Sequence, residues 1–181
     1  TGFKMKADLP RKEPETLKFW DGLNIYETLR QEKEGRQKYI LHDGPPYANG
    51  DIHMGHALNK ILKDIIIKYK SMQGFDAPYI PGWDCHGLPI EYKVLAETKD
   101  SNKLTKMEIR QRCREYALNF AEIQKEQFKR LGIFGDWENP YLTLSNDYSA
   151  AVIEVFKELV EKGYVYKSKK PVYWCAVCRT A

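Results

Sequence analysis

Cysteines, histidines and long apolar runs are all scarce in this sequence. Four cysteines and four histidines occur among 181 residues. Only Cys175 and Cys178 have the close spacing of metal ligands, and nothing suggests a secreted disulfide framework, so we expect a reducing, cytoplasmic setting. No apolar run approaches the roughly 18–20 residues that cross a bilayer, so we expect no membrane partner.

Two common nucleotide-binding motifs are also missing. The sequence contains neither the phosphate loop, G-x-x-x-x-G-K followed by Ser or Thr, nor the dinucleotide fingerprint G-x-G-x-x-G. Any nucleotide site in this chain must therefore be built differently. The formal net charge of +4 is too small to indicate nucleic-acid binding by itself.

The two ends of the sequence suggest a longer protein. The chain begins at Thr1 rather than at an initiator Met, and it stops at Ala181, shortly after the Cys-x-x-Cys pair. We therefore expect some functional parts to lie outside this chain.

Apolar periodicity and turn residues predict the local structure. Residues 1–37 are polar and interrupted by prolines, with one short helical patch at residues 17–20, and we expect an arm that packs on a following domain. Short apolar runs predict buried strands at Tyr39–Leu41 and Ala77–Ile80. The run Tyr164–Trp174 is rich in β-forming residues and predicts a hairpin or a departing strand.

Three longer segments have helical periodicity. The first extends from Met54 to Met72 and ends before Gly74, and its apolar stripe is wide enough to cover a sheet. The second begins with the capping box Thr105–Glu108. The third runs from about Asp147 to Lys162. The apolar residues expected to face inward on these three helices are Leu58, Ile61, Leu62, Ile65, Ile66, Tyr69 and Met72, then Ile109, Cys113, Tyr116, Phe120 and Ile123, and finally Val152, Val155, Phe156, Leu159 and Val160.

The alternation of strands and helices indicates an α/β fold with a parallel sheet. Ligands of such sheets bind beyond the carboxyl ends of the strands. Two glycine-rich loops, residues 43–53 and 81–89, follow the predicted strands. All four histidines lie in or beside these loops: His42, His53, His56 and His86. We therefore expect the functional site between the two loops.

The first loop and its continuation, Gly44 to His56, read GPPYANGDIHMGH and combine features of a phosphate site. Glycines let the backbone approach a ligand closely, and the paired prolines stiffen the loop before binding. His53 and His56 lie one turn apart at the start of the predicted helix, where free N–H groups attract anions. Imidazole donors there would stabilise phosphate charge that develops in a reaction.

Other interpretations of these residues remain open. His53 and His56 could be polar residues at a solvated helix start. Their spacing also suits two ligands of a metal ion, with His86 or Asp84 as a third. Asp84 itself lies beside Trp83 at a predicted strand end, where a carboxylate can pair with a cation or cap a local turn.

The string His53-Met54-Gly55-His56 resembles the H-I-G-H signature of class I aminoacyl-tRNA synthetases, with Met in the second, apolar position. It is preceded by DGPPYANG and followed by ALNK. A second match at residues 81–91 reads PGWDCHGLPIE. Together these motifs resemble isoleucyl-tRNA synthetases of the bacterial or organellar type, whereas valyl and leucyl relatives differ in both motifs. The similarity extends over residues 9–181.

The resemblance implies a Rossmann-like parallel sheet that forms the first half of a class I catalytic domain. It also implies a reaction in which isoleucine and ATP, with Mg²⁺, give isoleucyl-adenylate and pyrophosphate, before transfer to tRNA(Ile). No nucleophilic side chain is required because isoleucine supplies the attacking carboxylate, so positioning and charge stabilisation carry the rate. The resemblance further implies that the full enzyme is a monomer.

The family pattern assigns roles to residues of both loops. His53 and His56 would be catalytic and would contact the ATP phosphates. The ATP site as a whole would comprise His53, Met54, Gly55 and His56, with Gly55 beneath the adenine.

The same pattern places the amino-acid site beside these residues. Gly44 and Pro45 would line one wall of the isoleucine pocket, and Asp84 would bind the ammonium group. The family's second signature, Lys-Met-Ser-Lys-Ser, is absent, and the run Lys167–Lys170 is no match because it precedes a β-like segment at the wrong place. We therefore expect the chain to hold half of an active site.

The resemblance also divides the chain into three parts. Residues 1–37 would be the arm, residues 38–165 the Rossmann-like catalytic half, and residues 166–181 the start of a connective insertion. Cys175 and Cys178 would supply half of a structural Zn²⁺ site. Three alternatives remain: a valyl- or leucyl-tRNA synthetase fragment, a non-catalytic RNA-binding module of the same fold, and a zinc-ribbon interaction protein.

Overall fold

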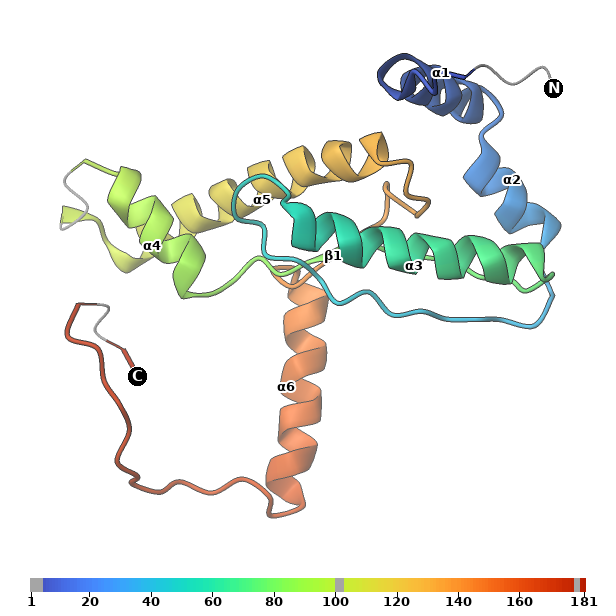
Figure 1. Ribbon diagram of the computed structural model, residues 1–181. Helices are drawn as coiled ribbons and strands as arrows, with labels where there is room; N and C mark the ends of the chain where they lie inside the picture. Colours follow the sequence, from blue (N-terminus) through green and yellow to red (C-terminus); the bar gives the residue numbers. More distant parts are fainter. Residues whose placement is uncertain (1–4, 100–102, 178–179) are drawn as a thin grey trace. The chain divides into compact units, whose positions relative to one another are not determined.

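The computed structural model describes residues 5–99, 103–177 and 180–181. The chain divides into two compact units, Thr1–Ser145 and Asn146–Ala181. The elements along the chain (Figure 1) are α1 (Leu9–Gly22), α2 (Ile25–Glu32), α3 (Met54–Met72), β1 (Gly82–Trp83), α4 (Leu88–Glu97), α5 (Lys106–Arg130), β2 (Tyr141–Leu142) and α6 (Asn146–Glu161). No helix within the described ranges is both long and apolar enough to span a membrane.

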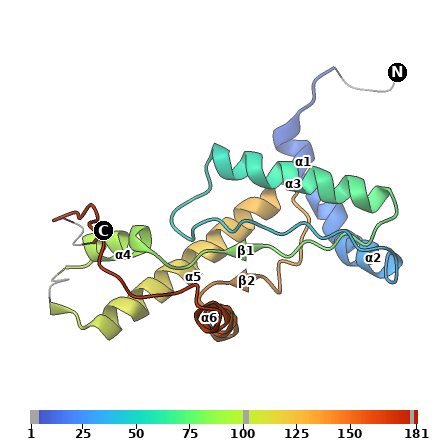
Figure 2. The same ribbon diagram turned by 90° about the horizontal axis from the view of Figure 1, so that it is seen from below.

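The first unit combines helices with short parallel strands, which agrees with the predicted α/β class. β1 and β2 pair in parallel, with Gly82 opposite Tyr141 and Trp83 opposite Leu142 (Figure 2). A third extended segment, residues 38–47, runs parallel to residues 76–84 and pairs with it only through single bridges near its two ends.

The predicted strands at Tyr39–Leu41 and Ala77–Ile80 are wrong, because neither segment forms regular strand pairing. Prolines have no N–H group to donate to a ladder, and the second segment holds one at position 78 and is followed by another at 81. Between them, the N–H of Tyr79 donates to the hydroxyl of Tyr26 over 3.1 Å instead of to a neighbouring strand. Regular pairing therefore starts only at Gly82.

Helix α3 has the predicted bounds, but the prediction of its buried face is wrong. The buried residues are Lys60, Asp64, Ile67 and Ser71. The apolar stripe expected to cover the sheet is exposed, as in Leu58 at 62% and Ile65 at 57%. The polar face is buried because its charges find partners: Asp64 accepts hydrogen bonds from Lys68 over 2.6 Å and from the N–H of Phe134 over 2.9 Å.

Helix α5 begins with the predicted capping box, in which Thr105 and Glu108 exchange hydrogen bonds with each other's backbone N–H groups. Its most buried residues are Ala117, Ala121, Gln124 and Phe128. The five apolar residues expected to be buried on this helix are only half-buried. The buried apolar core of the unit comprises Ala48, Ile67, Ala77, Tyr79, Trp83, Cys85, Ile90, Val94, Ala117, Ala121, Phe128, Ile133 and Trp137.

The N-terminal segment contains two helices, α1 and α2, where the sequence predicts one short helical patch. Trp20 packs edge-on against Phe134, with ring centroids 5.4 Å apart. Arg30 of α2 forms an ion pair with Asp76. Helices α1 and α2 thus pack against the segments around Phe134 and Asp76 of the same unit.

The second unit consists of α6 and the segment that follows it. The left-handed backbone of Gly163, with φ of 76°, ends the helix as predicted. The prediction of an inward apolar face is wrong within this unit, because Val152 and Phe156 are 55% and 53% exposed. The predicted β-structure at residues 164–174 is also wrong, since a strand needs a pairing partner and none is assigned there among the described residues.

Candidate functional site

Backbone hydrogen bonds bring the two glycine-rich loops together. The N–H of Asp84 donates to the carbonyl of Pro46 over 2.8 Å, and the N–H of Ala48 donates to the carbonyl of Asp84 over 2.9 Å. Both loops follow parallel segments, so their adjacency is that of neighbouring carboxyl ends in a parallel sheet. The two loops therefore lie side by side, and the functional site expected between them stays a prediction.

The first loop is held from the side by α5. Gln124 is fully buried and donates from its amide to the carbonyls of Tyr47 and Gly50 over 3.0 and 2.8 Å. Its carbonyl accepts the indole N–H of Trp83 over 3.0 Å. Further along the loop, the hydroxyl of Tyr116 donates to the side chain of Asn49 over 2.9 Å. These contacts fix a loop that has little regular structure of its own.

His53 and His56 form a stacked pair at the start of α3. Their ring centroids lie 3.9 Å apart with an interplanar angle of 26°. Nδ1 of His53 accepts the N–H of Gly55 over 3.0 Å, and Nδ1 of His56 accepts the N–H of His53 over 3.3 Å. A neutral imidazole that accepts at Nδ1 carries its proton at Nε2. Each ring therefore has an Nε2–H group that can donate to an anion.

This arrangement differs in one respect from the sequence prediction of free N–H groups. The ring of His53 accepts from the N–H of Gly55 and, in the capping box, from that of His56, so the donors that the helix start offers to an anion are mainly imidazole N–H groups. Partial burial lowers the pKa of His56 below its ordinary value of 6.5, and the neighbouring His53 and Lys60 further disfavour its protonated form. His56 is therefore neutral at pH 7.

A cavity of about 310 Å³ adjoins the histidine pair, and its lining residues are Gly44, Pro46, His53, Gly55, His56, Asn59 and Lys60. Four of these are predicted site residues. Pro46 lines the cavity, whereas Pro45 and Asp84 are not among the lining residues. Asn59 and Lys60 were missed by sequence reasoning, although their positions three and four residues after His56 place them on the same helix face.

The second loop arranges its polar groups around Thr143. Oδ1 of Asp84 accepts the N–H of His86 over 3.3 Å and the hydroxyl of Thr143 over 3.4 Å. The N–H of Cys85 donates to the same hydroxyl over 2.9 Å. Burial raises the pKa of the Cys85 thiol to about 11, so this group is protonated and is a poor nucleophile at pH 7.

A metal ion has little support from the side chains that the structure describes. Within the described ranges, no group of three or more His, Cys, Asp and Glu side chains could hold a metal. This is evidence against the metal interpretation of His53 and His56. Cys175 is exposed, and Cys178 lies outside the described residues. The Zn²⁺ site therefore stays a prediction.

Comparisons with known proteins identify the family of this chain. The family model of class I tRNA synthetases (I, L, M and V) matches residues 15–181. Isoleucine–tRNA ligases of Carboxydothermus hydrogenoformans, Syntrophomonas wolfei and Natranaerobius thermophilus are 60%, 59% and 57% identical over the whole chain. The chain spans about a fifth, 20%, of the length of each of these relatives.

A solved structure shares the fold. The crystal structure of the ternary complex of Agrobacterium radiobacter LeuRS, tRNA and LeuAMS matches with a TM-score of 0.72 at 22% identity. The match covers 96% of this chain and 20% of that one. The family match, the relatives and the shared fold lead to one conclusion: the chain belongs to the class I tRNA synthetases of the isoleucine, leucine, methionine and valine group.

Proposed function

We propose that this chain supplies the ATP- and isoleucine-binding half of an isoleucine–tRNA ligase. The complete enzyme joins isoleucine to ATP, releases pyrophosphate and transfers the isoleucyl group to tRNA(Ile). Identities of 57–60% to three isoleucine–tRNA ligases support isoleucine rather than leucine or valine as the amino acid. Mg²⁺ would accompany the ATP phosphates and offset part of their charge.

The observation that carries the proposal is the imidazole pair at the start of α3. In the adenylation step the carboxylate of isoleucine attacks the α-phosphorus, and negative charge builds up on the phosphate oxygens. The Nε2–H groups of His53 and His56 can donate to those oxygens, because both Nδ1 atoms already accept backbone N–H groups. Donors fixed before the reaction stabilise such charge without reorganising.

Gly55 suits a flat ligand surface between the two histidines. A Cβ at this position would lie 2.9 Å from Cε1 of His53, so any larger residue would displace the ring. On the family pattern, Met54 and Gly55 would complete the ATP site with the adenine lying over Gly55.

The amino-acid site is proposed to lie between the two loops. Gly44 and Pro45 would form one wall of the isoleucine pocket, and the half-buried carboxylate of Asp84 would bind the ammonium group. The backbone hydrogen bond from Asp84 to Pro46 supports this arrangement, because it keeps the carboxylate next to the proposed wall.

The remaining parts of the chain receive proposed roles from the family. The short parallel strands would belong to a Rossmann-like sheet completed by other parts of the enzyme. Residues 1–37 would be the arm, residues 38–165 the catalytic half, and residues 166–181 the start of the connective insertion, with Cys175 and Cys178 as half of a Zn²⁺ site.

Calorimetric titration of the chain with a non-hydrolysable isoleucyl-adenylate analogue tests the proposal. We expect saturable binding that His56→Ala weakens strongly. His42→Ala is the matched control, because His42 stacks on Tyr141 and has no proposed contact with the ligand. Equal binding by His56→Ala would contradict the proposal. Salt-sensitive RNA binding that survives His56→Ala, without analogue binding, would favour the RNA-binding module.

A further inference from the structure

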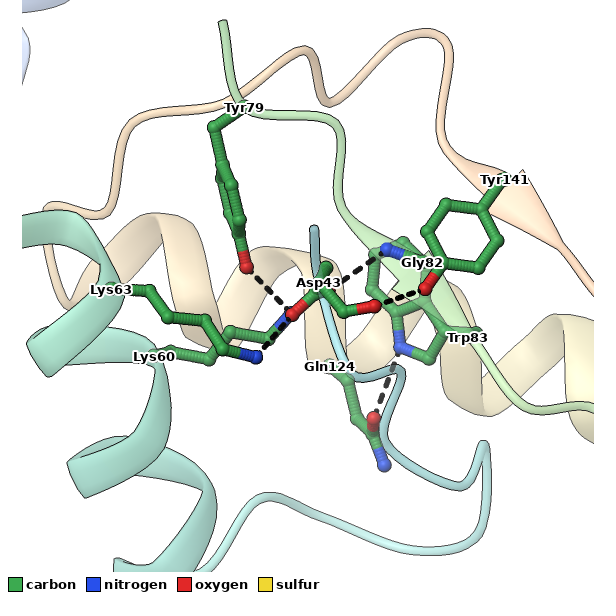
Figure 3. A network of polar contacts seen from close by, with 8 residues as sticks. All are labelled: Asp43, Lys60, Lys63, Tyr79, Gly82, Trp83, Gln124 and Tyr141. Atoms are coloured by element: carbon green, nitrogen blue, oxygen red, sulfur yellow. Dashed lines mark hydrogen bonds and ion pairs between the residues drawn. The ribbon is translucent and has the colours of Figure 1, made fainter. Parts of the chain in front are cut away.

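A buried carboxylate joins the three segments that carry the proposed site. Asp43 is only 1% exposed and directly precedes Gly44. Its carboxylate accepts hydrogen bonds from Lys60 and, over 2.7 Å, from Lys63, both on α3 (Figure 3). It also accepts the backbone N–H of Gly82 over 3.0 Å, two residues before Asp84. One side chain therefore connects the first loop, the second loop and helix α3.

The same residue is also held through its backbone. The hydroxyl of Tyr141 donates to the carbonyl of Asp43, as Figure 3 shows. The N–H of Gly82 would otherwise lack an acceptor in the region where prolines interrupt the pairing of the extended segments. The carboxylate thus replaces a missing ladder bond, and it does so at the position where β1 begins.

Lys60 is buried and has contacts beyond its ion pair with Asp43. The side chain of Lys60 is 2% exposed, and its ammonium group donates to the hydroxyl of Tyr79 over 3.2 Å. It lies 5.1 Å from the centroid of the Phe128 ring. Lys60 also lines the cavity beside His56. Its position is therefore fixed from several sides, next to the proposed phosphate site.

The charges of this cluster do not cancel. One carboxylate faces two ammonium groups, so the cluster of Asp43, Lys60 and Lys63 carries a net positive charge next to the cavity. Burial works against ionisation of Asp43, but the ammonium of Lys60 holds the pKa of this carboxyl below its ordinary value. The carboxylate is therefore ionised at pH 7 and keeps both lysines oriented.

We infer that Asp43 is a positioning residue for adenylate formation, which acts through Gly44, Gly82 and Lys60. It sets the distance between the two loops that would bind isoleucine, and it holds Lys60 in place at the cavity that His53 and His56 also line. This inference rests on the proposed function. It goes beyond it because Asp43 lines neither the ATP site nor the isoleucine site.

The test uses a chimaera in which this chain replaces the matching segment of the Carboxydothermus hydrogenoformans ligase. Asp43→Asn retains the size of the side chain but removes its charge and one of its two acceptor oxygens, which accept from Lys60, Lys63 and Gly82. We expect kcat/KM for isoleucine in ATP–pyrophosphate exchange to fall roughly 10–100-fold, because small displacements of reacting groups are costly. The KM for ATP should rise by a smaller factor, because Lys60 beside the cavity loses its partner while His53 and His56 stay in place.

Two further variants separate positioning from stability. Asp76→Asn breaks another largely buried ion pair, between Asp76 and Arg30, in which the side chain of Arg30 is 16% exposed and that of Asp76 is 14% exposed. It should lower the melting temperature and leave both KM values unchanged. Asp43→Asn combined with Lys60→Met removes the unpaired buried charge, so the melting temperature should recover while the isoleucine defect persists. Recovery of activity together with stability would overturn the inference.

Hydrogen exchange measured on the isolated chain, outside the chimaera, separates this inference from the proposed function. If Asp43 positions the loops, Asp43→Asn should accelerate exchange at the N–H of Gly82 and shift the NMR signals of Gly44 and His56, whereas Asp76→Asn should not. Unchanged exchange and unchanged signals would overturn the inference. A chimaera that carries the natural sequence of this chain and is inactive would contradict the proposed function. The hydrogen exchange and NMR measurements would then still test whether Asp43 positions the loops.

Discussion

Nδ1 of His53 accepts the backbone N–H of Gly55 over 3.0 Å at the first turn of α3. The side chain thus caps the helix and fixes its own tautomer in one interaction. Nδ1 of His56 likewise accepts the N–H of His53, and the two rings stack against each other, so each ring is held by a hydrogen bond and by its neighbour. The signature is therefore a local structure of its own, ordered by the chain before any ligand binds.

The lowered pKa of His56 predicts a pH dependence of stability. The unfolded chain binds a proton at this residue near its ordinary pKa of 6.5, whereas the folded chain resists it, so protonation favours unfolding. The contribution of His56 is present above pH 6.5 and is lost as the pH falls below it. Urea unfolding between pH 7.5 and 5 should show a steeper decline for the natural chain than for His56→Gln. Parallel curves would refute this prediction.

Gln124 predicts a large effect on stability. Gln124→Leu leaves the carbonyls of Tyr47 and Gly50 and the indole N–H of Trp83 without their partner. A buried unsatisfied group costs about 1–3 kcal/mol. The bond from Trp83 is buried and the two carbonyl bonds are part-buried, so we expect a loss of about 2 kcal/mol in the free energy of unfolding. Gln111→Leu is the matched control.

Gln111 lies on the same helix, is exposed, and bonds only to the side chain of Glu115 in the contacts described. Its replacement should change the free energy of unfolding by less than about 0.5 kcal/mol. Similar losses for the two variants in urea unfolding would show that Gln124 does not hold the loop.

Gly82 predicts a steric limit beside β1. A Cβ at this position would lie 2.1 Å from Cζ of Tyr141, a distance that no packed structure accommodates. Gly82→Ala should therefore lower the melting temperature sharply, and Tyr141→Ala in the same chain should restore part of it. Gly22→Ala is the control, because a Cβ there meets nothing within 4 Å. An additive double variant would contradict the proposed clash.

Cys85 and Cys175 should differ in reactivity. Cys85 is 3% exposed and its thiol has a pKa raised to about 11, whereas Cys175 is exposed. Only the thiolate reacts with iodoacetamide, so Cys175 should be alkylated first at pH 8 in the folded chain. Peptide mass spectrometry after short exposures measures the order, and equal rates in the folded chain would contradict the burial of Cys85.

The sequence predicted α3, α5 and α6 because their ends carry strong local signals, whereas it missed α4 and gave α1 and α2 as one short patch. The capping box at Thr105 and the glycine at position 74 depend only on neighbouring residues, and the structure has both. Strands depend on partners distant in the chain. The prolines at 78 and 81 divert backbone donors to side chains such as Tyr26, which no local pattern reveals.

The candidate site was predicted in part for the same reason. His53 and His56 were found because they lie one turn apart in a recognisable string. Asp43 was missed as a functional residue, because its partners Lys60 and Gly82 are 17 and 39 positions away. The buried polar face of α3 was missed because the apolar stripe on the other side has the more regular period.

Isoleucine-dependent ATP–pyrophosphate exchange by the chimaera tests the central claim most directly. The account predicts exchange that requires isoleucine, is abolished by His56→Ala and is retained by His42→Ala. It also predicts that the chain alone, as half of an active site, exchanges far more slowly than the chimaera. Exchange by the chain alone at the rate of the chimaera, or a chimaera that remains active with His56→Ala, would contradict it.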